Sequence, residues 1–307
     1  MGRRLQVKLL IIGAQSGVGV ELLKLLKERN IEWVAPEPGH INIRDPLSAA
    51  RVITQAAPDQ VINLAAFCAG SQLAVLEAEQ QAQRCDEVNH LQAGLIAQVC
   101  DHLHVPLIHL SSVYVFGGEK KLAYNEQDPP RPNCVYGHTT LAGEQAIIST
   151  IKQHIIIRAG WLFGPRQDEM MRRWIDELRA GDGNVTVFRR KFAPTPVEDL
   201  ARVILAVSLQ VDCKVDVWGV YHYATLESLR ESEFVQQLVK FAAQHDESVY
   251  RLLDHLNINL GRTEPPQIAN ATLASKKIFE TFGIKQRPWH GSLQRLVKSW
   301  YKGRNEI

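Results

Sequence analysis

Hydrophobic and polar positions change between two periods along the first half of the chain. Residues 7–13 (VKLLIIG) form an almost continuous apolar run, which is typical of a strand buried on both faces of a parallel sheet. Residues 19–30 then place leucines at helical spacing against Glu and Lys. The same reasoning predicts further strands at 31–35, 60–66, 106–112 and 154–164, and helices at 46–57, 72–103 (with breaks) and 136–150. This alternation predicts an α/β protein with a Rossmann-type doubly wound parallel sheet.

The second half of the chain is less regular and carries no linker or internal repeat. Strands are predicted at 185–188 and 217–224, and helices at 168–181, 196–209, 231–246 and 271–282. We therefore expect a Rossmann domain over residues 1–165 and a smaller lobe over residues 166–307 that is interleaved with it.

Composition and charge exclude several classes of function. The 307 residues carry a formal net charge of +2, which gives no general attraction to nucleic acid or to an anionic membrane. No apolar run approaches the roughly 20 residues that span a bilayer. The cysteines show no CxxC pair and no metal-ligand spacing, so we expect reduced thiols, no metal site and a cytoplasmic location; they are Cys68, Cys85, Cys100, Cys134 and Cys213.

A glycine-rich turn, GAQSGVG (13–19), follows the first predicted strand and opens a helix. Gly13 permits the tight turn, and the helix N-terminus beyond it offers free N–H groups and a positive dipole end to a pyrophosphate. Gly19 allows the helix to pack closely on the strand. In this context the turn predicts a dinucleotide site, NAD or NADP.

An acidic residue at the end of the second strand favours NAD, and a basic residue favours NADP. The chain reads VAPEPGHINIRDP there, with Glu37 as the early acidic candidate. Glu37 favours NAD, whereas Arg44 or the N-terminal Arg3 and Arg4 would favour NADP if they reach the site, and the sequence does not decide between them.

Several motifs together resemble one family. VINLAA, VNHLQAG, LSSVYVFGG, YNEQDPPRPNCVYG, RAGWLFG and KFAPTPVEDLA stand in this order along nearly the whole chain. They resemble motifs of the extended short-chain dehydrogenase/reductases, most closely the dTDP-4-dehydrorhamnose (RmlD-like) reductases. The resemblance implies an NAD(P)H-dependent reductase of a nucleotide-activated 4-keto-6-deoxy sugar, with no nucleic-acid or membrane partner, as a homodimer or beside a partner enzyme.

The resemblance also implies roles for residues. Tyr136 and Ser112 match the catalytic acid and the hydroxyl that binds the substrate oxygen, while Trp161, Ser112 and Phe67 are substrate candidates. With the turn, the candidate cofactor-binding residues are Gly13, Gln15, Ser16, Gly17, Val18, Gly19, Glu37, Asn42, Ile43, Ala65, Ala66, Asn89, Ser111, Tyr136 and Thr140.

One position departs from the family pattern. The family has a lysine four residues after the tyrosine, whose charge lowers the tyrosine pKa and whose ammonium holds the nicotinamide ribose. Here that position is Thr140, which can bind a hydroxyl but carries no charge. His138 lies on a different helical face and is a poor substitute.

The missing lysine leaves a second function open. The chain could be a catalytically silent NAD(P)-binding regulatory or partner subunit of the same fold, or, as a weaker alternative, an epimerase or dehydratase. Cofactor binding without turnover would indicate the silent subunit.

Overall fold

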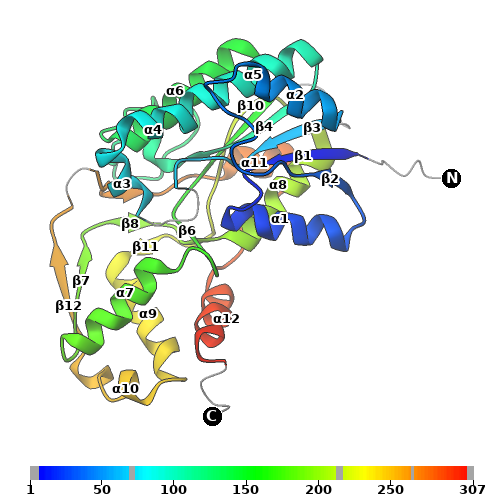
Figure 1. Cartoon of the computed structure of the whole chain (residues 1–307). Coiled ribbons are helices and arrows are strands. Elements are labelled where there is room, and N and C mark those ends of the chain that lie inside the picture. The colour runs from blue at the N-terminus through cyan, green and yellow to red at the C-terminus, as the bar shows by residue number, and fades with distance from the viewer. Residues whose placement is uncertain (1–6, 69–72, 212–216, 264–265, 303–307) are drawn as a thin grey trace.

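The structure is a computed structural model that describes residues 7–68, 73–211, 217–263 and 266–302. Within these residues, the centre is a six-stranded sheet in the order β10-β5-β4-β3-β1-β2, with every neighbouring pair parallel (Figure 1). Its strands are β1 Lys8–Ile12, β2 Glu32–Val34, β3 Gln60–Asn63, β4 Leu107–Ser112, β5 His154–Ala159 and β10 Gly219–Tyr223. The sheet confirms the predicted Rossmann-type fold.

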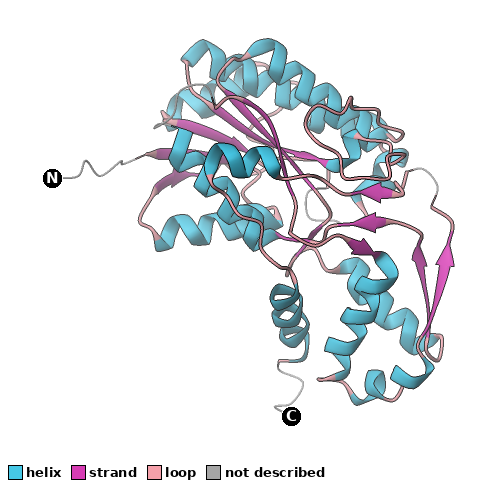
Figure 2. Ribbon diagram, turned by 180° about the vertical axis from the view of Figure 1, so that it is seen from behind, coloured by secondary structure: helices cyan, strands magenta, loops and turns pink. Residues whose placement is uncertain are grey.

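Helices cover both faces of the sheet, and each face has its own apolar core (Figures 1 and 2). Ile53 and Ile147 are fully buried on one face and Leu22 on the other, and each such side chain contributes roughly 1.5–3 kcal/mol. No helix in the described part of the chain has the length and apolarity to cross a membrane. The covering helices are α2 Leu47–Ala56, α5 Gln92–Leu103 and α6 Val135–Thr150 on one face, and α1 Gly17–Glu28, α8 Val197–Val211 and α11 Lys276–Phe282 on the other.

The order of the strands reverses between β1 and β3. From β1 the chain passes to β2 on one side, and then returns to place β3 on the other side of β1. Parallel sheets bind ligands at the carboxyl ends of their strands, next to such a reversal. The loops after β1, β3 and β4 are therefore the place to look for a site.

The second half of the chain contributes to both parts of the molecule. β10, α8 and α11 return to the central sheet, whereas most of the other elements form a lobe beneath it (Figure 1). This lobe has an aromatic core that includes Trp161, Trp174, Phe192 and Phe234. The boundary between residues 165 and 166 remains a prediction. The remaining strands and helices after residue 160 are β6 Leu162–Phe163, α7 Glu169–Ala180, β7 Asn184–Phe188, β8 Lys191–Phe192, β9 Thr195–Pro196, β11 Leu229–Arg230, α9 Glu231–Ala243, α10 Glu247–Tyr250, the 3-10 turn Leu253–His255, β12 Asn257–Gly261, β13 Asn270–Ala271 and α12 His290–Tyr301.

The structure corrects the predicted elements in two places. The helix predicted from residue 271 begins only at Lys276, because Asn270–Ala271 pairs with β8 as a strand. The strand predicted over 154–164 is divided, since β5 ends at Ala159 and Leu162–Phe163 pairs with β9 instead. The breaks expected in the stretch 72–103 divide it into α3 Ala74–Gln80, α4 Ala82–Asp86, the π-helix Glu87–Leu91 and α5.

A buried ion pair fastens α6 to the sheet. Arg158 on β5 donates from Nε and Nη2 to the Glu144 carboxylate, at 2.8 and 2.6 Å, and both side chains are almost fully buried. The Ser111 hydroxyl donates to the same carboxylate, and Arg158 Nη1 lies 3.4 Å from Nε2 of the fully buried His222. The pair therefore holds α6, and with it Tyr136, against β4 and β5.

We expect Glu144→Ala to lower the free energy of unfolding by about 3–5 kcal/mol, because it leaves the Arg158 charge buried without its partner. The measurement is urea unfolding at equilibrium. Glu247→Ala is the control, since it removes an exposed ion pair with Arg251 and should change stability by less than about 0.5 kcal/mol. A loss below about 1 kcal/mol for Glu144→Ala would contradict the role given to this pair.

Candidate functional site

The turn after β1 is shaped to approach the neighbouring strand closely. Gly13 has φ +77°, and a Cβ there would lie 2.5 Å from the backbone nitrogen of Ala65. Only glycine fits both the conformation and the space. Ser16 is the N-cap of α1, with its Oγ accepting from the Gly19 N–H at 3.0 Å. The serine in the glycine motif thus completes the helix N-terminus, which is the part of the turn suited to an anion.

Two adjoining cavities, of about 870 and 960 Å³, extend from this turn along the carboxyl ends of the strands. Both are lined by Ser16, Ala65 and Ala66. The first cavity is further lined by Ile12, Gly13, Ala14, Gln15, Pro36, Glu37, Pro38, Gly39, Ile41 and Gln92. The second is further lined by Val18, Leu64, Cys68, Ala74, Val75, Asn89, His109, Leu110, Ser111, Ser112, Tyr114, Tyr136, Thr140, Ala159, Gly160, Trp161, Leu162 and Gln167.

The first cavity carries an acidic side chain beside the turn. Glu37 lies in the loop after β2, and its Oε2 accepts from Gln15 Nε2 at 3.3 Å. No lysine or arginine is among the described residues that line this cavity. Arg44 is exposed outside it, and Arg3 and Arg4 lie outside the described residues. A carboxylate here can accept hydrogen bonds from ribose hydroxyls and repels a phosphate.

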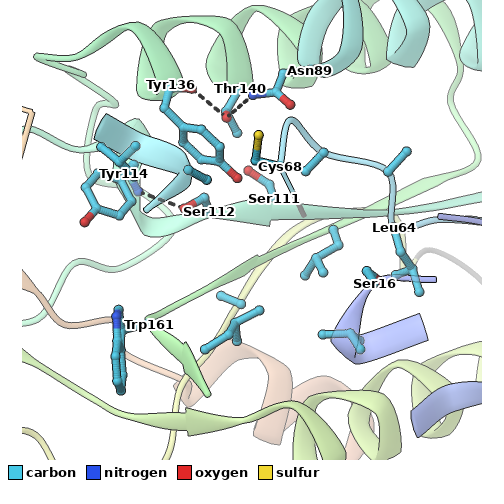
Figure 3. Close-up of a pocket in the computed structure, with 18 of the residues that line it drawn as sticks. Ser16, Leu64, Cys68, Asn89, Ser111, Ser112, Tyr114, Tyr136, Thr140 and Trp161 are labelled. Atoms are coloured by element: carbon cyan, nitrogen blue, oxygen red, sulfur yellow. Dashed lines mark hydrogen bonds between the residues drawn. The ribbon is translucent and has the colours of Figure 1, made fainter. Parts of the chain in front are cut away.

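Tyr136 and Ser112 face the second cavity from two different elements. Tyr136 lies in the first turn of α6, whose N-cap Cys134 accepts from the Gly137 N–H, and its ring points from the helix toward the end of β4 (Figure 3). Ser112 ends β4, and its Oγ accepts from the Tyr114 N–H at 3.3 Å. This accepted bond leaves the Ser112 O–H able to donate into the cavity. Ser112 and Tyr136 therefore present two hydroxyl donors to the same cavity.

Thr140 is tied to the backbone of its own helix. Its Oγ1 donates to the Tyr136 carbonyl at 2.7 Å and accepts from Asn89 Nδ2 at 3.4 Å (Figure 3). Asn89 lies in the π-helix, a feature that often marks functional sites, and its Oδ1 accepts from the Phe67 N–H at 2.7 Å. A Cβ at Gly143 would lie 2.1 Å from the Asn89 carbonyl oxygen, so the two helices pack at a distance that only glycine allows.

The second cavity is electrically neutral around the tyrosine. No Lys, Arg, Asp or Glu is among the described residues that line it. Burial raises the pKa of Tyr136 well above its usual range, with nearby thiols and Tyr114 adding to the effect. His138 is exposed on the helix and does not line the cavity. The phenol of Tyr136 is therefore a protonated donor at neutral pH.

The structure brings most of the predicted site residues together at the two cavities, with five exceptions. Gly17 and Gly19 line neither cavity, because they lie in the first turn of α1, packed against Gln167 and the Ala14 backbone. Asn42 and Ile43 line neither cavity; Ile41 does so instead, because Asn42 turns into the loop that precedes α2, where its N–H donates to Ser48. Phe67 is 2% exposed and packs beneath Tyr136 without lining the cavity. Trp161 lines the second cavity but is only 9% exposed, and its ring packs edge-on against Phe192 and Phe234 in the lobe core.

The residues that line the cavities but were not predicted from the sequence include Gln167 and His109. Gln167 follows a short turn after β6, and its Oε1 would lie 2.4 Å from a Cβ at Gly17, so the lobe contacts the glycine-rich turn. No local pattern in the sequence indicated this contact. His109 is a polar residue within the apolar strand LIHLSS, and that interruption was a signal that could have been followed.

A family model matches nearly the whole chain. The family described as RmlD substrate binding domain matches residues 7–302. A dTDP-4-dehydrorhamnose reductase from Sinorhizobium fredii is 28% identical over 254 residues, which cover 81% of this chain and 83% of that protein. The crystal structure of a dTDP-4-dehydrorhamnose reductase from Clostridium acetobutylicum superposes with a TM-score of 0.80 at 24% identity, covering 95% of this chain and 99% of that one. A dTDP-4-dehydrorhamnose reductase from Bacillus anthracis, in complex with NADP, gives a TM-score of 0.77 at 21% identity, with coverage of 95% and 99%.

Proposed function

Because the chain belongs to the RmlD substrate-binding-domain family, we propose that it is an NAD(P)H-dependent reductase of a nucleotide-linked 4-keto-6-deoxy sugar. The proposal rests on one observation above all: Ser112 and Tyr136 line the same cavity, and this cavity adjoins the glycine-rich turn. The similar proteins of S. fredii and C. acetobutylicum are named as reductases of this kind.

The residues present fit a dinucleotide. Gly13, with φ +77°, lets the turn lie directly against the Leu64–Ala65 backbone, and the N-terminus of α1 that follows presents backbone N–H groups for a pyrophosphate. Asn89, Thr140 and Ala65 line the part of the cleft that would receive the nicotinamide half. The bound cofactor would supply the hydride.

Two residues of the chain orient the substrate carbonyl and supply the proton that its oxygen takes up. The Ser112 O–H donates to the substrate carbonyl oxygen and holds it beside the Tyr136 phenol. As negative charge develops on that oxygen, Tyr136 gives up its proton to it. A ketone reduced in this way becomes a strongly basic alkoxide, so a phenol with a raised pKa can still donate, although as a weaker acid than one beside a lysine.

The experiment that tests this function is oxidation of NADH and NADPH, followed at 340 nm, over a panel of nucleotide-linked keto sugars. We expect turnover with at least one dTDP-4-keto-6-deoxyhexose and none with the corresponding 4-hydroxy sugar. If the cofactor binds but no sugar of the panel is reduced, the protein is a silent subunit and the proposed function is wrong.

We further propose that NAD(H) is the preferred cofactor, because Glu37 lines the first cavity and no lysine or arginine is among the described residues that line it.

The free thiols Cys68, Cys85, Cys100 and Cys134 are in keeping with a reducing, cytoplasmic compartment. Cys213 lies outside the described residues.

Glu37→Arg should shift the ratio of NADH to NADPH affinity toward NADPH by about 10- to 100-fold, because the change removes a charge that repels the 2′-phosphate and adds one that attracts it. Calorimetric titration of both cofactors measures the ratio. Glu32→Arg is the matched control, because Glu32 lies on β2, is exposed, and does not line the cavity. An unchanged ratio in Glu37→Arg would contradict the assignment.

A further inference from the structure

His109 is a buried histidine that the proposed chemistry does not yet use. It lies in the middle of β4 and is 3% exposed, yet it lines the second cavity together with Asn89, Tyr136 and Thr140. The strand is otherwise apolar up to Ser111, so a histidine placed there for packing alone would bury a polar ring at a cost.

The hydrogen bonds around His109 fix which nitrogen carries the proton. Asn63 lies opposite His109 in the register of β3 and β4. The Asn63 Oδ1 accepts from the Ala65 N–H at 3.1 Å, which leaves its Nδ2 facing His109 Nδ1 at 3.1 Å. An amide Nδ2 can only donate, so Nδ1 accepts and the ring proton is on Nε2.

The ring is also uncharged. Burial lowers the pKa of His109 to about 4, so the imidazole is neutral near pH 7. His109 and Ser111 lie on the same face of β4, since side chains alternate along a strand. The Ser111 hydroxyl contacts Glu144 on α6, so this face is turned toward the helix that carries Tyr136 and Thr140.

We propose that His109 binds the cofactor, its Nε2–H donating to a hydroxyl of the ribose on the nicotinamide side. In the family pattern a lysine ammonium at the position of Thr140 holds this ribose. Here the neutral N–H of His109 on β4 would make a ribose contact in its place. This inference rests on the proposed dinucleotide site and adds a binding residue to it.

The test is cofactor binding by calorimetry, with NADH and with ADP, which lacks the nicotinamide riboside. His109→Ala should weaken NADH binding about five- to tenfold, the value of one hydrogen bond, and leave ADP binding within about twofold. His109→Gln should retain most of the NADH affinity, because its amide nitrogen can occupy the place of Nε2. His109→Asn, whose amide reaches only the place of Nδ1, should lose as much as alanine.

The control is His154→Ala. His154 is a second buried strand histidine, bonded through Nδ1 to the Ile151 carbonyl and outside the cavity, so its loss should not change NADH binding. Unchanged NADH affinity in His109→Ala, or an equal loss of ADP affinity, would overturn the proposal. If the alanine variant does not fold, the glutamine and asparagine variants decide, and equal NADH affinities for these two would overturn it as well. Binding without sugar reduction would refute the proposed function but not this contact.

Discussion

Tyr136→Phe is expected to lower kcat for sugar-nucleotide reduction by about 10²- to 10⁴-fold, the usual contribution of a positioned acid. The phenol is the proton donor of the proposed reaction and lines the cavity beside Ser112. Phenylalanine keeps the ring that packs edge-on against Tyr114 at 6.1 Å, so the Kd for NADH should stay within about twofold. Steady-state kinetics and a cofactor titration measure the two effects.

The matched control for Tyr136→Phe is Tyr221→Phe. Tyr221 on β10 is also buried, but its hydroxyl donates to the Val217 carbonyl. Tyr221 lines neither cavity. Loss of this hydroxyl should affect stability and leave turnover unchanged. Wild-type turnover in Tyr136→Phe would show that another group supplies the proton.

Thr140→Lys is expected to raise kcat/KM for reduction by about tenfold or more. Thr140 now bonds the Tyr136 carbonyl and contributes no charge, and the described cavity lining offers none. An ammonium one helical turn from Tyr136 would favour the phenolate, make the phenol a stronger acid, and add a donor for the ribose. Thr140→Met controls for length, because it fills similar space without a charge and should give no gain.

Thr140→Lys should also change the way in which kcat/KM for reduction depends on pH. Burial raises the pKa of Tyr136, so the wild-type phenol keeps its proton through neutral and alkaline pH. Reduction needs the protonated phenol, so the wild-type kcat/KM should show no loss of this acid between about pH 6 and 10. In Thr140→Lys the lysine lowers that pKa, and kcat/KM should fall on the alkaline side. Equal profiles for the lysine and methionine variants would contradict this account.

The parts of the fold that follow from short-range pattern could be predicted from the sequence. The apolar run before Gly13 and the helix after Ser16 indicated β1 and α1, and the structure has both. The helix expected over 271–282 is present as α11, but its predicted start was wrong, because Ala271 pairs with β8 as a strand. Pairing between distant segments is not visible in local periodicity.

The site residues differ in the same way in how far the sequence predicts them. The sequence places Tyr136 and Ser112 in the cleft because each stands in a recognisable motif next to an element boundary, and both line the second cavity. Phe67 and Asn42 were misplaced, since their positions depend on how the loops after β3 and β2 turn. Gln167 comes to the glycine-rich turn only through the packing of the lobe, which no spacing in the sequence encodes.

If the protein reduces a sugar carbonyl with Tyr136 as the acid and without a lysine, hydride must pass from the nicotinamide to C4 of the sugar. The most direct measurement uses NADH dideuterated at C4 of the nicotinamide with a dTDP-4-keto-6-deoxyhexose, followed by mass spectrometry and NMR of the sugar nucleotide. We expect one deuterium at C4 of the sugar with wild-type protein and a large loss of labelled product with Tyr136→Phe. Bound cofactor with no deuterium in any sugar of the panel would contradict the proposed function.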